Sequence, residues 1–218
     1  MTPPGPGTYP HLFSPFSLGR LRLPNRFTIP GLTTNYATAD GFVTDALCTY
    51  LGARARGGFG LIVTENLGVH PSGRVMPRMA MIDDDRYVPG LARLASAVTR
   101  EGGIVVGQLS HAGRQTKSRI TGLPLVAPSA IPCPINRETP RALAADEIHE
   151  LAQAFVSAAI RLAAAGFDGV EIHGAHGYLV GAFLSRYSNR RDDAFGGPLD
   201  NRMRFLLDIV DGIQRALG

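Results

Sequence analysis

Four side chains that can donate or accept protons lie close together in the sequence: Glu171, His173, His176 and Tyr178. Residues 170–173 read Val-Glu-Ile-His between flanking glycines, a pattern that predicts a short buried strand ending in a turn. Because side chains alternate along a strand, Glu171 and His173 are expected on the same face. Parallel α/β proteins form their sites at the carboxyl ends of strands. The spacing therefore predicts a site with two imidazoles and a phenol at the end of this strand.

Each of these residues also has an ordinary structural interpretation. A histidine at a strand end can be held in a structural hydrogen bond, and Tyr178 can pack its ring with the hydroxyl in solvent. Glu171, His173 and His176 are in addition the residue types of a metal site built from two histidines and one carboxylate. In that arrangement Glu171 would lie deeper along the strand than His176. At the level of single residues these alternatives stay open.

The composition limits the classes of function. With 218 residues, of which 44% are apolar, the chain can bury one sizeable core. The net charge is +4, and Lys and Arg are scattered, which argues against a nucleic-acid or polybasic membrane-binding protein. No apolar run approaches the roughly 20 residues of a membrane helix, and no basic stretch followed by an apolar run opens the chain. Cys48 and Cys133 are expected to be reduced. We therefore expect a cytoplasmic protein without nucleic-acid or membrane partners.

Strand and helix patterns alternate along the chain. Residues 1–11 are rich in Pro and Gly and are expected to form a flexible arm, and residues 16–25 read as a hairpin that closes one end of the fold. Four strand–helix units follow, with expected strands at 27–31, 61–65, 104–109 and 170–173 and expected helices at 44–56, 85–100, 146–165 and 198–217. Thr44 is an N-cap, whereas the third helix has no Ser or Thr cap, so that Asp146 and Glu147 must favour its start by charge alone.

This order predicts an α/β fold with a parallel sheet and helices outside it. No strand leads at once into a G-x-G-x-x-G turn of the dinucleotide kind, so the alternative to an open doubly wound sheet is the first half of a TIM (β/α)8 barrel, which in full takes roughly 250 residues. The proline-rich loop 124–140 is too long for a plain connector and is expected to cover a site. Arg114 is expected to tie this loop, and Arg202 to pair with Asp192.

Six separated motifs resemble one known family. They are LFSPF at 12–16 with LPNR at 23–26, IPGLT at 29–33, GQLSHAGR at 107–114, APS at 127–129, EIHGAHGY at 171–178, and FLS at 183–185 leading to RDDAFGGPLDNR at 191–202. In this order they resemble the N-terminal half of the Old Yellow Enzyme family, flavin-dependent ene-reductases built on a TIM barrel. The trimethylamine dehydrogenase and 2,4-dienoyl-CoA reductase branches share much of this pattern. The resemblance implies that residues 12–218 form the N-terminal half of a flavin-binding barrel.

The resemblance also implies FMN as cofactor and assigns residues to it. Gln108 matches the glutamine whose amide meets the pyrimidine edge of FMN, and Thr33 matches the residue whose hydroxyl reaches a flavin carbonyl. Pro30, Gly31 and Leu32 are expected along the ring, and His173 is expected to face it as well. Asn66 is read as a loop residue after the second strand, where the family usually has Ala or Gly. A flavin edge carries carbonyls and an N–H, which such donors and acceptors suit.

His173 and His176 match the pair that holds the carbonyl or nitro oxygen of an activated alkene, where negative charge develops during reduction. Tyr178 matches the residue that delivers a proton to the α-carbon, and NADPH or NADH is the implied reductant. The expected activity is therefore reduction of α,β-unsaturated carbonyl or nitro compounds. The alternatives are an amine dehydrogenase or a dienoyl-CoA reductase-like branch, a non-catalytic half-barrel, and the metal enzyme described above.

The seventh and eighth units, which in the family grip the FMN phosphate, have no counterpart in this sequence. The chain is therefore expected either to be part of a longer enzyme or to meet a complementary half-barrel or a second copy of itself, because an open edge of parallel strands tends to associate.

Overall fold

The computed structural model describes residues 7–218 and contains a four-stranded parallel sheet in the order β3-β4-β5-β8. The strands are β3 (Thr28–Ile29), β4 (Leu61–Gly68), β5 (Ile104–Ser110) and β8 (Gly169–Ile172), with two two-stranded sheets formed by β1 (Phe16–Leu18) with β2 (Leu21–Leu23) and by β6 (Val126–Ala127) with β7 (Arg141–Ala142). The helices are α1 (Pro10–Phe13), α2 (Asp45–Arg56), α3 (Val88–Thr99), α4 (Ser118–Thr121), α5 (Ala145–Ala164), α6 (Leu179–Leu184) and α7 (Leu199–Leu217), with short 3-10 turns at Pro71–Gly73 and Asp85–Tyr87.

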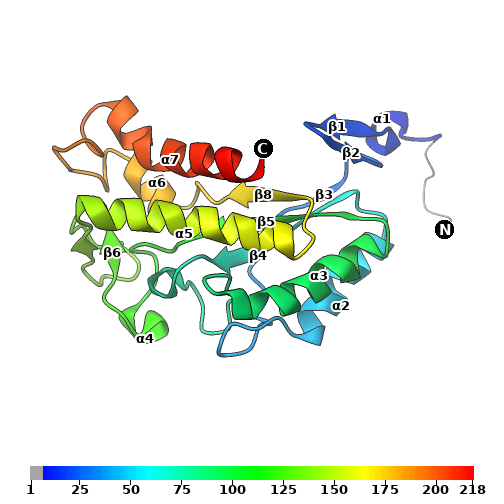
Figure 1. The fold of residues 1–218 in the computed structure, drawn as a ribbon, viewed down its shortest axis with the longest axis horizontal. Coiled ribbons are helices and arrows are strands. Elements are labelled where there is room, and N and C mark those ends of the chain that lie inside the picture. The colour runs from blue at the N-terminus through cyan, green and yellow to red at the C-terminus, as the bar shows by residue number, and fades with distance from the viewer. Residues whose placement is uncertain (1–6) are drawn as a thin grey trace.

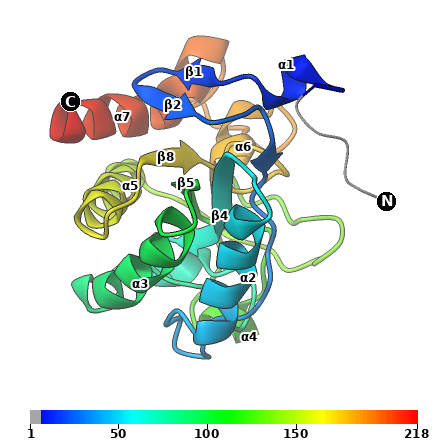
Figure 2. The same ribbon diagram turned by 90° about the vertical axis from the view of Figure 1, so that its right-hand side faces the viewer.

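The long helices cover one face of the sheet (Figures 1 and 2). Along β5, Val105 and Leu109 are fully buried on this face and join the main core, which also contains the apolar stripes of α2, α3 and α5. Gly107 lets α5 approach closely, since a Cβ at this position would lie 2.4 Å from Cδ1 of Leu162. The expected α/β arrangement of a parallel sheet with outer helices is confirmed.

The opposite face of the sheet is closed at one end by the hairpin β1–β2, as expected. Leu23 of the hairpin is buried against Leu61, Val63 and Val106 of β4 and β5. Figure 1 shows this hairpin beyond the ends where the strands begin, whereas the loops that follow the strands, with α4, α6 and β6, gather at the other end. The strand ends on the loop side therefore remain available for polar side chains.

Several expected boundaries are corrected by the structure. β4 continues to Gly68, so Asn66 is a buried strand residue and not a loop residue. β8 is an edge strand whose residues are only half-buried, with Glu171 exposed, and not the buried strand expected. The helix α6, directly after Tyr178, was not expected at all.

The N-terminal segment and the start of α5 also differ in detail from the expectation. Residues 1–6 of the expected arm lie outside the described residues, and its last two residues, Pro10 and His11, begin α1. At the start of α5 the carboxylate of Glu147 accepts a hydrogen bond from the backbone N–H of Ala144 at 2.8 Å and pairs with Arg141. Glu147 thus satisfies a free helix donor directly, so the expectation of charge alone was wrong.

The proline-rich loop is held by the buried Arg114. Arg114 donates to the carbonyls of Ile131 at 3.1 Å and Pro132 at 3.0 Å, which confirms the expected tie. The expected pair of Arg202 with Asp192 is wrong. Arg202 donates to the carbonyls of Leu184 and Gly197, because these lie at the end of α6 and just before α7, within its reach.

A chain of hydrogen bonds fixes the loops after β4 and β5 relative to each other. His111 is buried, its Nδ1 accepts from the N–H of Gly113 at 3.0 Å, and its Nε2 lies 3.0 Å from Oγ of Ser72. The Ser72 hydroxyl in turn lies 2.8 Å from Nδ1 of His70. The carbonyl of His111 accepts from the N–H of Leu179 at 2.9 Å, so this chain ends at the start of α6, beside Tyr178.

The same contacts disfavour a charge on His111, because a second ring proton would face the Gly113 N–H. Burial lowers the pKa of His111 to about 3, and burial also lowers the pKa of His70. Both histidines are therefore neutral at neutral pH. At a pH below the ordinary pKa of histidine, the unfolded chain binds protons at these two residues more readily than the folded protein does.

We expect the free energy of unfolding to fall as the pH drops from 6.5 towards 3, because the unfolded chain takes up a proton that folded His111 does not. Such a group removes about 1.4 kcal/mol per pH unit in this window. In His111→Gln this part of the pH dependence should disappear, as measured by denaturant unfolding at a series of pH values. His149→Gln, at an exposed histidine on α5, is the control. Equal slopes for the wild type and His111→Gln would contradict the assignment.

Candidate functional site

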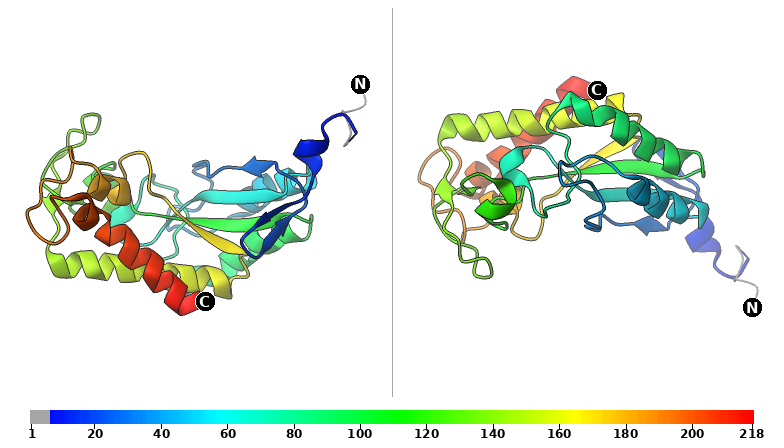
Figure 3. Two further views of the ribbon diagram at one scale, coloured as in Figure 1. Left: turned by 90° about the horizontal axis from the view of Figure 1, so that it is seen from above. Right: turned by 90° about the horizontal axis from the view of Figure 1, so that it is seen from below.

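Polar side chains line the loop-side end of the sheet on the face opposite the helices. Asn66, Gln108 and Glu171 occupy matching positions in β4, β5 and β8, since Asn66 pairs with Gln108 and Gln108 with Glu171 in the strand register. Nε2 of Gln108 donates to Oε1 of Glu171 at 2.6 Å, and the hydroxyl of Thr33 donates to Oδ1 of Asn66 at 3.0 Å. Seen from above and below, the strands run side by side toward this end (Figure 3). The register thus makes a row of amides and a carboxylate across three strands.

A bulge in β4 sets this row. The register of β4 against β5 shifts between Val63 and Asn66, which places Asn66 on the same face as Gln108. The Thr64 hydroxyl donates to the carbonyl of Glu65 at 2.8 Å and accepts from the N–H of Gln108 at 3.2 Å, so one side chain satisfies backbone groups that the bulge leaves unpaired. Sequence reasoning missed the bulge.

The segment after β3 passes directly over Gln108. A Cβ on Gly31 would lie 2.7 Å from Nε2 of Gln108 and 2.8 Å from the Thr64 carbonyl, so only glycine fits there. Pro30 and Leu32, which flank it, are exposed, and Leu32 is 61% exposed. In the structure the backbone at Gly31 closely approaches the Gln108 side chain. The neighbouring Leu32 places its apolar side chain on the exposed side of the segment.

Glu65 is a positioning residue that sequence reasoning overlooked. It is buried, and Oε2 of its carboxylate accepts from the N–H of Thr34 at 2.8 Å and from the Thr34 hydroxyl, while Oε1 accepts from the N–H of Ala80 at 3.5 Å. These contacts hold the segment that carries Thr33 to the end of β4. A carboxylate at the end of a predicted strand, after the apolar residues 61–63, was the signal, because burying an unpaired charge is too costly to leave unexplained.

His173, His176 and Tyr178 form a compact cluster, as the sequence predicts. Nε2 of His173 lies 3.3 Å from Nδ1 of His176, and the ring centre of Tyr178 lies 4.7 Å from that of His173 and 6.3 Å from that of His176. His173 follows β8 directly, with its N–H bonded to the Leu109 carbonyl at 2.9 Å, and stands two residues, roughly 7 Å, beyond Glu171 on the same face. The cluster therefore adjoins the row of polar side chains.

The turn between the histidines is held from outside. His176 and Gly177 both have positive φ, +57° and +68°, a conformation that costs energy for a histidine. The side-chain amide of Gln115 donates to the His176 carbonyl at 2.6 Å and accepts from the thiol of Cys133 at 3.0 Å. Gln115 is a second positioning residue that sequence reasoning missed, and a positive φ at a histidine could not have been read from the residues alone.

Hydrogen bonds and burial set the protonation of the cluster. The N–H of Ala175 donates to Nδ1 of His173 at 3.2 Å, so the neutral ring carries its proton on Nε2, the atom that faces His176. Burial, with the neighbouring His176, lowers the pKa of His173, and burial raises the pKa of the Tyr178 phenol. At neutral pH the cluster offers an uncharged imidazole donor and a protonated phenol.

These residues fit the edge of a flavin ring. The alternating carbonyl and N–H groups of such an edge need acceptors and donors side by side, which the Gln108 amide, the Thr33 hydroxyl and Asn66 provide.

The three residues of the metal alternative are not arranged as ligands of one ion. Glu171 accepts a hydrogen bond from Gln108, and residues 7–218 contain no cluster of three or more His, Cys, Asp or Glu side chains placed to hold a metal ion.

Two curated proteins illustrate what this chain is similar to in sequence. The chain is 47% identical over 212 residues to the NADH oxidase of Thermoanaerobacter brockii, covering 96% of this chain and 33% of the relative. It is 42% identical over 204 residues to the NADPH dehydrogenase of Geobacillus sp. strain WCH70, covering 93% and 59%. The chain thus spans less than two thirds of the curated relatives that it matches.

Two solved structures show the same fold. One is a complex of 2-naphthoyl-CoA reductase with 2-naphthoyl-CoA, with a TM-score of 0.93 and 34% identity over 96% of this chain and 34% of that one. The other is an Old Yellow Enzyme homologue from Zymomonas mobilis, with a TM-score of 0.88 and 34% identity over 96% and 61%. Because the chain matches only 34% and 61% of these two structures, the expectation that it forms part of a larger fold is confirmed.

A family model matches residues 11–218, nearly the whole chain. This match and the relatives confirm the resemblance inferred from the six motifs. The chain belongs to the NADH:flavin oxidoreductase / NADH oxidase family.

Proposed function

We propose that this chain supplies the flavin-facing wall and the proton donor of an FMN-dependent ene-reductase that reduces activated C=C bonds of α,β-unsaturated carbonyl or nitro compounds with NADPH or NADH. The observation that carries the proposal is the cluster of His173, His176 and Tyr178 next to Gln108 and Thr33. A purely structural role does not require three proton-carrying side chains at one strand end, since a single hydrogen-bonded histidine would satisfy the polar groups there.

The proposed cofactor contacts come from the segment after β3, from β4 and β5, and from the residue that follows β8. Gln108 and Thr33 would meet the pyrimidine edge of FMN, with Asn66 fixing the Thr33 hydroxyl, and Pro30, Gly31 and Leu32 would lie along the ring with His173 facing it. When bound, the reduced flavin supplies the hydride that adds to the β-carbon of the alkene. The chain's own residues then stabilise the developing negative charge and donate the proton.

In this mechanism the histidines and the tyrosine have separate tasks. As hydride adds to the β-carbon, negative charge develops on the carbonyl or nitro oxygen, and the N–H groups of His173 and His176 stabilise it there. Tyr178 donates its phenolic proton to the α-carbon, which completes the reduction. Because burial raises the pKa of Tyr178, the donor stays protonated throughout the neutral range.

A second candidate is reduction of an unsaturated acyl-CoA thioester. It is favoured by the TM-score of 0.93 to the 2-naphthoyl-CoA reductase complex. The chemistry at the oxygen and the α-carbon would be the same, since a thioester carbonyl also activates the alkene. Rates of flavin reoxidation by cyclohexenone and by an enoyl-CoA thioester decide between the two: the first candidate requires the enone to be faster, and the second requires the reverse.

The sheet also bears on the assembly. Within residues 7–218, β3 and β8 are the edge strands of the main sheet. We propose that further strands, from additional chain, a complementary half-barrel or a second copy, close it into a barrel and complete the FMN phosphate site.

None of the helices in the described part of the chain is long and apolar enough to cross a membrane. Cys48 and Cys133 are free, and we propose a cytoplasmic location.

In Tyr178→Phe, we expect flavin reoxidation by an enone to slow by roughly 10²- to 10⁴-fold, because the general acid is lost, whereas flavin reduction by NAD(P)H stays near the wild-type rate. Stopped-flow absorbance of the flavin measures both half-reactions. Tyr187→Phe is the matched control, because Tyr187 is 56% exposed and its ring packs against the Arg114 guanidinium. A Tyr178→Phe enzyme that slows equally in both half-reactions would argue against the donor role.

In the double variant His173→Ala, His176→Ala, phenols should no longer perturb the visible spectrum of the oxidised flavin, because the donors for the phenolate oxygen are gone. Titration of the flavin-loaded protein with a phenol measures this. The exposed His149→Ala variant should respond like the wild type. If the double variant binds flavin and still shows the phenol-induced change, the oxygen-holding role is wrong.

A further inference from the structure

A cavity of about 380 Å³ adjoins the catalytic cluster on the side of the loop after β5. His176 and Tyr178 form part of its wall, and Lys117 and Arg119, at the start of α4, form another part. Apolar wall is provided by Val75, Met76 and Ile120. A ligand in this cavity would therefore contact the two proposed catalytic side chains and two cations at the same time.

The two cations in this wall, Lys117 and Arg119, form no ion pair among residues 7–218, and no Asp or Glu lines the cavity. The nearest acid along the loop is Glu138, whose two carboxylate oxygens accept from the N–H of Ser118 at 3.2 and 3.1 Å. Glu138 is thus engaged with backbone at the start of α4, and the cavity keeps an excess of positive charge.

The loop that carries the cations is fixed relative to the cluster. The hydroxyl of Thr116 donates to the Arg74 carbonyl at 2.7 Å, and Gln115 holds the His176 carbonyl. At the other end, α4 stops at Gly122, whose positive φ of +71° and bond to the Ser118 carbonyl end the helix. Lys117 therefore lies two residues after Gln115, which positions His176. The positive charges of the cavity wall are thus held in a fixed place relative to the cluster.

We propose that this cavity binds the anionic end, a carboxylate or a phosphate, of a ligand whose reactive end lies at His176 and Tyr178. Lys117 and Arg119 supply charge-assisted hydrogen bonds to the anion, and the apolar wall accommodates the carbon skeleton between the two ends. The inference rests on the proposed ene-reductase function and narrows it. The anion belongs either to the alkene substrate or to the phosphates of the nicotinamide reductant.

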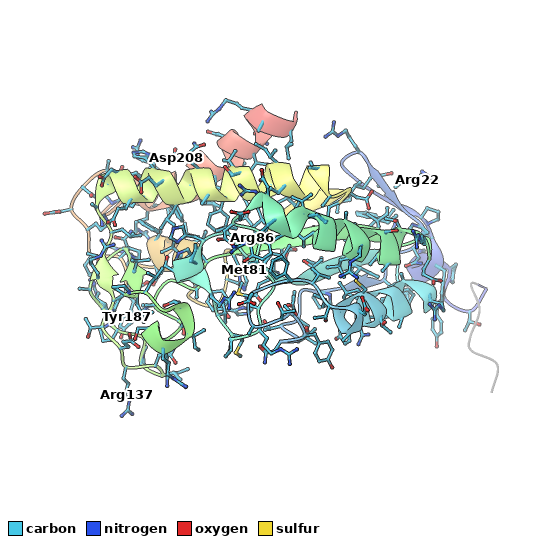
Figure 4. All side chains as sticks on the ribbon, turned by 60° about the horizontal axis from the view of Figure 1, so that its bottom comes forward. Arg22, Met81, Arg86, Arg137, Tyr187 and Asp208 are labelled. Atoms are coloured by element: carbon cyan, nitrogen blue, oxygen red, sulfur yellow. The ribbon has the colours of Figure 1, made fainter. Side chains whose placement is uncertain are left out.

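The test uses the flavin-loaded protein and the double variant Lys117→Gln, Arg119→Gln. The control variant is Arg137→Gln, which removes one positive charge from the same loop at a side chain that points outward (Figure 4). The binding probes are para-hydroxybenzoate and its neutral methyl ester, titrated against the flavin spectrum. We expect the ratio of the two dissociation constants to shift against the carboxylate by about tenfold in the double variant, with the ester unchanged, and to stay constant in Arg137→Gln.

Two kinetic arms identify the source of the anion. The first compares flavin reoxidation by para-carboxycinnamaldehyde and by its methyl ester, and the second compares flavin reduction by NADPH and by the phosphate-free benzyl dihydronicotinamide. A loss confined to the carboxylate alkene assigns the cavity to the substrate, and a loss confined to NADPH assigns it to the reductant.

Unchanged ratios in the binding titration and in both kinetic arms would overturn the inference while leaving the proposed function intact. A different result marks failure of the proposed function: a wild-type protein that binds flavin but is not reoxidised by either cinnamaldehyde and not perturbed by either phenol. The neutral members of each pair also report whether the double variant keeps its site.

Discussion

The register of three parallel strands is the constraint on which the site depends. Asn66, Gln108 and Glu171 lie opposite one another because β4, β5 and β8 pair in one fixed alignment, and the 2.6 Å hydrogen bond from Gln108 to Glu171 joins two of these strands through their side chains. A slip of any one of these strands by one residue would turn its own side chain of the row toward the helices. The bulge at Thr64 and Glu65 is what brings Asn66 into this alignment, so a local irregularity of β4 is part of the site.

The cluster at the end of β8 depends on supports from other segments. Gln115, from the loop after β5, holds the turn that carries His176, and the backbone of His111 holds the first residue of α6 beside Tyr178. Glu65 does the same for the segment that carries Thr33. The turn that carries His176, the start of α6 and the segment that carries Thr33 thus take their positions from polar contacts between segments distant in sequence. Such contacts fix geometry more strongly than they add stability, because the groups involved would otherwise be unpaired in the interior.

Much of this arrangement follows from local sequence patterns. The alternation of apolar strands and amphipathic helices predicted the parallel sheet and outer helices, and the order of Glu171, His173, His176 and Tyr178 predicted the cluster. The features that were missed arise from non-local contacts. Asn66 was read as a loop residue because a polar Thr-Glu-Asn run usually ends a strand, and only pairing with β5 keeps it in β4. Gln115 and Glu65 act on residues far along the chain, and no local period reports such contacts.

The central claim is that the cluster and the row of polar side chains face one flavin ring. A crystal structure of the flavin-loaded protein with a bound phenol tests it most directly. The account predicts the pyrimidine edge of the ring within hydrogen-bonding distance of Gln108 and Thr33, and the phenol oxygen within hydrogen-bonding distance of His173 and His176. A flavin bound with that edge elsewhere, or a phenol oxygen away from both histidines, would contradict it.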